Sequence, residues 1–167
     1  YAINYFGMDE FRAGIISATL TGAAIIANPI MGWAGDHWGH RRIMLVGILA
    51  ATMSSLLAWQ ASSLNWFYLI MVLTGLANVA IWTITLTLTV EFGEETERPL
   101  YIGLSNTLVA PATILAPLIG GWIADNRGYP FMFLCTAIAG VLTLAIIFFF
   151  FKEPRLRDNQ KLLEIRG

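Results

Sequence analysis

The sequence predicts an all-α integral membrane protein that crosses the bilayer as five helices. Its 167 residues are 57% hydrophobic and 13% charged, which is too little charge for the surface of a soluble domain of this size. Asp, Glu, Lys and Arg are absent from residues 13–35, 43–90, 100–124 and 128–151. Each of these stretches is long enough to span a hydrocarbon core, which takes roughly 20 helical residues.

The charge-free stretches define the helices in order. The second stretch is too long for one helix, and Gln60, Ser62 and Asn65 interrupt it near its middle. It therefore predicts two spans joined by a tight polar turn. The expected helices cover residues 13–34, 43–61, 66–90, 100–124 and 131–151, so that residues 1–151 form one transmembrane bundle, followed by a tail over 152–167.

Two other folds fit the pattern less well. Helices of a soluble protein carry a charged residue every turn or two on their solvent-exposed face, whereas these runs carry no charged residue. Residues 83–90 alternate between polar and apolar as a β-strand would, but a membrane barrel needs repeated strands of about ten alternating residues. The remaining runs are continuously apolar, which favours helices.

The composition also argues against several functions. Cys135 is the single cysteine, and His37 and His40 share one short segment with one acid, so we expect no metal site and no cofactor. The net charge of −1 gives no reason to expect a nucleic-acid partner. No span combines a nucleophile with a base, so we do not expect an enzyme.

Lysine and arginine predict the orientation, because positively charged loops resist translocation. Loops alternate between the two sides of the membrane. The loop after residue 34, the loop after residue 90 and the tail share one side, which carries the larger set of basic residues. That set is Arg41, Arg42, Arg98, Lys152, Arg155, Arg157, Lys161 and Arg166, against Arg12 and Arg127 on the other side. The tail is therefore expected to be cytoplasmic.

The segment between the first two helices carries the most specific motif, Gly32, Asp36, Gly39, Arg41 and Arg42. A glycine at the helix end allows a neighbour to approach closely, and a second one allows a tight reversal. The aspartate can lie beside the positive end of a helix dipole. The spacing resembles the Gly-x-x-x-Asp-x-x-Gly-x-Arg-Arg/Lys signature of the major facilitator superfamily of transporters.

The resemblance covers the whole chain and implies that the five helices are the eighth to twelfth of a twelve-helix transporter, in a six-helix bundle. Residues 121–128 repeat the Gly, Asp and Gly spacing on the opposite membrane face, as inverted repeats do. From the odd number of spans and the first residue, Tyr1, we expect that the N-terminal half is a missing partner. The resemblance implies that Asp36 docks on the helix over 100–124 and holds a cytoplasmic gate. Candidate gate partners are Glu91, Glu94 and Arg98.

Polar residues inside the spans indicate a candidate cavity for the transported solute. Buried amides are costly in hydrocarbon and usually face protein or water. The helix over 66–90 contributes most of them, and the alternative is that they only join helices by hydrogen bonds. The candidates are Asn28, Asn78, Trp82, Thr85 and Asn106. Gly14, Ala18 and Gly22 form a small-residue stripe suited to close packing, whereas residues 43–61 and 131–151 have the aliphatic surfaces of lipid-facing helices.

These observations favour secondary active or facilitative transport of a small solute by alternating access, in a multi-pass protein of the plasma or inner membrane. No ionisable residue lies in the middle of a span, so an ion-coupling residue is not visible in this sequence. The alternative is a membrane sensor or scaffold that has the same fold and moves nothing. The sequence does not identify the substrate.

Overall fold

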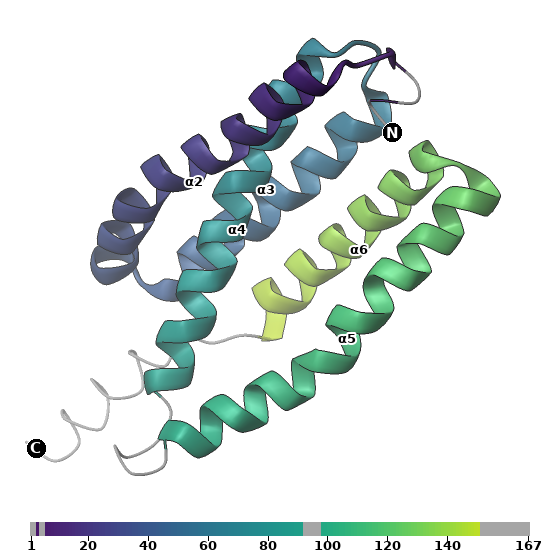
Figure 1. Cartoon of the computed structure of the whole chain (residues 1–167). Helices are drawn as coiled ribbons and strands as arrows, with labels where there is room; N and C mark the ends of the chain where they lie inside the picture. The colour runs from purple at the N-terminus through teal and green to yellow at the C-terminus, as the bar shows by residue number, and fades with distance from the viewer. Residues whose placement is uncertain (1–2, 4–5, 92–97, 151–167) are drawn as a thin grey trace, which may run out of the picture.

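The computed structural model describes residue 3, residues 6–91 and residues 98–150, although the side chains of 83–91, 98, 101 and 150 are not described. Within that part the chain is helical and has no strand (Figure 1). Successive helices run back and forth between the two ends of the molecule. They are α2 (Glu10–Trp38), α3 (His40–Gln60), α4 (Asn65–Glu91), α5 (Arg98–Arg127) and α6 (Tyr129–Phe150).

The predicted all-α membrane fold is confirmed. In the described part, five helices are long and apolar enough to cross a bilayer. Each predicted span lies within one of them apart from the terminal Ala61 and from Phe151, which lies outside the described residues. The helices extend past the charge-free runs at most ends, because helical hydrogen bonding continues beyond the apolar segment. α2, for example, begins at Glu10 and is capped by the Asp9 side chain, which accepts from the Arg12 amide at 2.7 Å.

Three glycines make close contacts at the three main helix pairs. A Cβ added to Gly75 of α4 would lie 2.7 Å from the carbonyl oxygen of Leu20 in α2. One added to Gly47 of α3 would collide with Ala80 of α4, and one added to Gly140 of α6 would collide with Thr52 of α3. Without a hydrophobic driving force in lipid, such close packing supplies much of the attraction between helices.

α3 has the largest buried share among the spans of the described part, which corrects the expectation that residues 43–61 face lipid. It packs against α2, α4 and α6. In its membrane-spanning segment 39% of the residues are buried, whereas this share is 6% in α5 and in α6. The small residues Gly47, Thr52 and Ser54 allow its neighbours to approach, although its composition is mostly aliphatic. α6 does have the predicted exposed surface.

Among the described residues, Gly14 and Gly22 of the small-residue stripe on α2 do not make the expected close contacts. A Cβ built on Gly14 or Gly22 would have nothing within 4 Å. The α2–α4 contact instead involves Ala23 and Ala24, beside Gly75. A uniformly apolar helix gives no sequence signal for the face that packs, because every face is hydrophobic.

Candidate functional site

The motif between the first two helices folds as a one-residue link. α2 ends at Trp38, α3 begins at His40, and Gly39 joins them with φ of 91°. Its amide donates to the carbonyl oxygen of Gly35 at 3.0 Å, which closes the last turn of α2. A side chain is strained at this φ, so the prediction that Gly39 permits a tight reversal is confirmed.

Close approach within the motif occurs at Gly35 rather than at Gly32. A Cβ on Gly32 would have nothing within 4 Å, because Gly32 lies on the opposite side of α2 from Ala27 and Ala34, which are buried in the core. A Cβ on Gly35 would lie 3.6 Å from the His40 ring, which is buried. The motif predicts no role for Gly35, and the sequence suggested only metal binding for His40.

Arg41 and Arg42 lie in the first turn of α3, not in a loop as predicted. Cations are unfavourable at this positive end of a helix dipole. Arg41 reaches away from it, and its Nη2 donates to the carbonyl oxygen of Phe148 in the last turn of α6 at 2.9 Å. Its Nε is buried and has no hydrogen-bond partner among the described residues, while Arg42 is exposed. Arg41 thus caps the negative end of α6.

Asp36 is exposed in the last turn of α2. The helix on which it was expected to dock is α5, but α2 and α5 are not among the packed helix pairs of the described part. α4 lies between them, with contacts to both (Figure 1). The structure does not test the predicted gate partners. Glu94 lies outside the described residues, and the side chains of Glu91 and Arg98 are not described.

The predicted echo of the motif has the same local structure. Gly128 joins α5 to α6 with φ of 85°, and its amide donates to the carbonyl oxygen of Ala124 at 2.9 Å. Near each link, a side chain donates to the carbonyl oxygen of a tryptophan four residues earlier: His37 to Trp33 at 2.9 Å, and Asn126 to Trp122 at 2.8 Å. The two links lie at opposite ends of the helices (Figure 1).

Comparison with known proteins identifies the family. The family model described as "Major Facilitator Superfamily" matches residues 1–165. The chain belongs to the major facilitator superfamily. It is therefore a multi-pass integral membrane protein of a family that moves small solutes across membranes.

Curated relatives of this superfamily chain include transport and resistance proteins. It is 24% identical over 147 residues to multidrug resistance protein 3 of Bacillus subtilis, covering 88% of this chain and 29% of that protein. It is 25% identical to the class H tetracycline resistance protein of Pasteurella multocida, covering 87% and 36%. It is 27% identical to the cis,cis-muconate transport protein of Acinetobacter baylyi, covering 94% and 38%. The chain thus spans about a third of the length of these relatives.

The predicted cavity residues of this major facilitator chain lie on three helices and are exposed where they are described. Asn78 and Trp82 lie one turn apart on α4, and Trp82 is 66% exposed. Asn28 of α2 donates to its own helix, from Nδ2 to the carbonyl oxygen of Ala24 at 3.0 Å, and Asn106 of α5 is exposed. The side chain of Thr85 is not described. Their grouping around one cavity therefore remains a prediction.

The polar residues that do join helices are different ones. Ser54 of α3 and Thr74 of α4 share a hydrogen bond of 2.8 Å between their hydroxyl oxygens. Thr74 also donates to the carbonyl oxygen of Ile70 in its own helix at 2.8 Å, and the Ser54 hydroxyl lies 3.3 Å from the same oxygen. Thr74 thus joins α4 to α3 by a hydrogen bond. This is the alternative role that the sequence analysis gave for polar residues of this helix.

Proposed function

We propose that the protein in its full length carries out secondary active or facilitative transport of a small solute by alternating access. The membership of the chain in the superfamily supports this proposal, because the relatives it matches include proteins named for transport and for drug resistance. On this proposal the partner of the chain is a second helical bundle of the same protein, and the bundles rock around a central site.

The exposed polar face of α4 is the part of the chain that we assign to the solute. Asn78 and Trp82 are exposed in the described part, although both lie within a helix of spanning length. An amide exposed to hydrocarbon is unfavourable, so this face is better suited to a water-filled cavity. We place Thr85, Asn28 and Asn106 along the same path as further lining residues.

We also propose that the α2–α3 link faces the cytoplasm and forms part of the gate, with Asp36 as its charged residue and Arg42 beside it. Glu91, Glu94 and Arg98 remain the candidate partners, because α4 ends and α5 begins at this same end of the molecule (Figure 1). A weak contact of about 0.3–1 kcal/mol at a helix end is enough to bias two states without locking either.

Transport by the reconstituted full-length protein tests the proposal. Sealed proteoliposomes would be assayed with labelled tetracycline and labelled cis,cis-muconate, the solutes named in the relatives. We expect uptake or efflux of a solute above that of empty liposomes, and we expect Asn78→Leu to reduce it. The control is Thr136→Val on α6, whose exposed hydroxyl donates to the carbonyl oxygen of Met132 in its own helix. If the protein inserts fully but moves neither solute, the result would favour the alternative of a membrane sensor or scaffold.

A further inference from the structure

The first turn of α3 carries a buried histidine that packs on the end of α2. The His40 side chain is 9% exposed. A Cβ built on Gly35, in the last turn of α2, would lie 3.6 Å from Cδ2 and from Nε2 of His40, and 3.9 Å from Cγ1 of Ile43. His40 and Ile43 are three positions apart, so they share one face of α3. The His40 ring forms no hydrogen bond within the described part of the chain, so packing on Gly35 holds it in place.

This contact fixes the direction of the last turn of α2. Gly39 alone joins α2 to α3, and α2 packs more extensively on α4 than on α3. The carbonyl oxygen of Gly35 accepts from the Gly39 amide at 3.0 Å, so the last turn and the link form one closed unit. Asp36 follows Gly35 in this turn and is exposed. A displacement of Gly35 would therefore move Asp36 with it.

The residue after His40 fixes the same turn of α3 to a third helix. Nη2 of Arg41 donates to the carbonyl oxygen of Phe148, in the last turn of α6, at 2.9 Å. His40 and Arg41 thus reach from one turn of α3 to two different helices, α2 and α6. The first turn of α3 therefore provides a fixed support for the end of α2.

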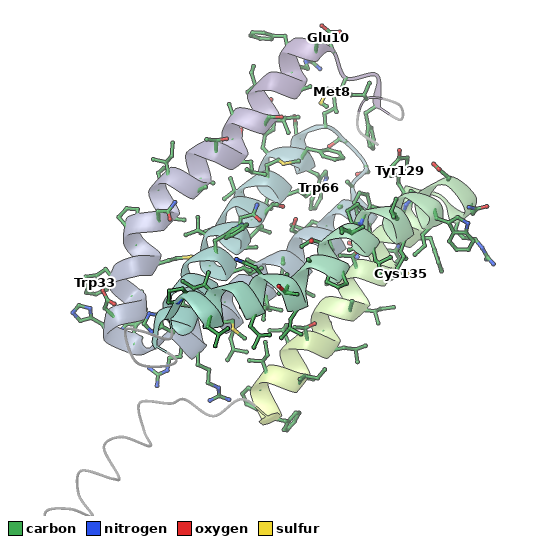
Figure 2. All side chains as sticks on the ribbon, turned by 60° about the horizontal axis from the view of Figure 1, so that its bottom comes forward. Met8, Glu10, Trp33, Trp66, Tyr129 and Cys135 are labelled. Atoms are coloured by element: carbon green, nitrogen blue, oxygen red, sulfur yellow. The ribbon has the colours of Figure 1, made fainter. Side chains whose placement is uncertain are left out.

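The second histidine of the motif makes a different set of contacts. His37 is exposed, and its Nδ1 donates to the carbonyl oxygen of Trp33 at 2.9 Å. Its ring stacks on the ring of Trp33 with centroids 4.4 Å apart. Trp33 is 57% exposed near the last turn of α2 (Figure 2). These contacts stay within α2, so His37 is a matched comparison for His40.

We propose that His40 is a positioning residue for the gate. Its ring holds the last turn of α2, and with it Asp36, on the first turn of α3. This inference rests on the proposed function, in which Asp36 favours one of two conformations. The effect of a charge at a helix end falls off within one turn, so it depends on where that turn is held. Removal of the His40 ring should therefore weaken the gate contact and leave the solute path on α4 intact.

Hydrogen exchange of the full-length protein in detergent micelles tests the contact without transport. We expect His40→Ala to lower the protection of the amides of residues 36–39 about threefold or more, because the last turn of α2 loses its packing. His40→Phe keeps a ring in this place and should restore the protection. His37→Ala should leave it unchanged. Unchanged protection in His40→Ala, or equal losses in the two alanine variants, would overturn the proposal.

Transport separates a positioning role from a purely structural one. The assay uses proteoliposomes with labelled tetracycline and labelled cis,cis-muconate, the solutes named in the relatives. We expect His40→Ala to lower the maximal rate about two- to fivefold with KM unchanged, which is the factor for loss of a contact at a helix end. His40→Phe should restore the rate.

A second substitution shows whether His40 acts through Asp36. In the Asp36→Asn protein, His40→Ala should have little further effect, because both substitutions remove the same contact. Additive losses would overturn the proposal, as would a raised KM with an unchanged maximal rate. If neither solute moves in the unsubstituted protein, the proposed function fails, whereas the exchange measurement still decides whether His40 holds the end of α2.

Discussion

Nη2 of Arg41, in the first turn of α3, lies 2.9 Å from the carbonyl oxygen of Phe148, in the last turn of α6. The bond joins two helices, and the two bonded residues are 107 positions apart in the sequence. It is a charge-assisted hydrogen bond, because the guanidinium group donates to a main-chain carbonyl oxygen. Arg41 belongs to the motif that resembles the family signature, so part of this motif has a structural role in the described chain.

The first prediction concerns this cap. Arg41→Ala should lower the free energy of unfolding by about 1–2 kcal/mol, because it removes a charge-assisted hydrogen bond between α3 and α6. The measurement is reversible unfolding in mixed detergent micelles. Arg42→Ala is the control, since Arg42 is exposed in the same helical turn, and it should change the unfolding free energy little. Equal effects of the two substitutions would show that the loss of a positive charge, and not the loss of the Arg41–Phe148 bond, lowers the free energy of unfolding.

The second prediction concerns the close contact of α2 and α4. Gly75→Ala should destabilise the protein by about 1–3 kcal/mol, because the new methyl group would lie 2.7 Å from the Leu20 carbonyl oxygen and force the helices apart. Gly103→Ala on α5 is the matched control. An added Cβ there would have nothing within 4 Å, so the better helix propensity of alanine should leave stability unchanged or slightly raised.

The contrast between Gly75 and Gly14 shows what this sequence could predict and what it could not. The helices were predictable because the length of a charge-free run corresponds directly to the thickness of the bilayer. The packed face was not, because lipid and protein interior are equally apolar and leave no amphipathic pattern to read. Gly14 and Gly22 fitted a packing motif by spacing alone, yet Gly75, Gly47 and Gly140 make the close contacts.

Some features of the candidate site were likewise predictable from the sequence, and others were not. The reversal at Gly39 and its echo at Gly128 were predictable, because a positive φ strongly favours glycine and the spacing repeats. The contact of Arg41 with Phe148 was not predictable, since a main-chain acceptor leaves no signal in the side-chain sequence. The role of Glu94 as a gate partner remains a prediction, because Glu94 lies outside the described residues.

The third prediction concerns the hydroxyl pair between α3 and α4. Ser54→Ala and Thr74→Val should show a coupling energy of about 0.6 kcal/mol in a double-mutant cycle, the usual size for hydrogen bonds between membrane helices. Unfolding in mixed micelles again gives the free energies. Ser55→Ala is the control, because Ser55 donates to the Ala51 carbonyl oxygen of its own helix at 3.1 Å. Additive effects of Ser54→Ala and Thr74→Val would contradict the contact.

The last prediction tests the proposed gate. Asp36→Asn in the full-length protein should slow transport in proteoliposomes while leaving membrane insertion intact. The substitution removes the negative charge but keeps the size of an exposed side chain at the end of α2. A charge that favours one of two conformations changes the rate of their exchange without being needed for folding.

Asp125→Asn is the matched control for this gate. Asp125 precedes Gly128 as Asp36 precedes Gly39, and it is also exposed, but it lies at the opposite end of the helices. The resemblance assigns the gate to the cytoplasmic link, so transport by the Asp125→Asn protein should stay close to that of the unsubstituted protein. An unchanged rate in Asp36→Asn would remove Asp36 from the mechanism. Equal losses in both variants would instead indicate that the two links of the inverted repeat act as paired gates on opposite membrane faces.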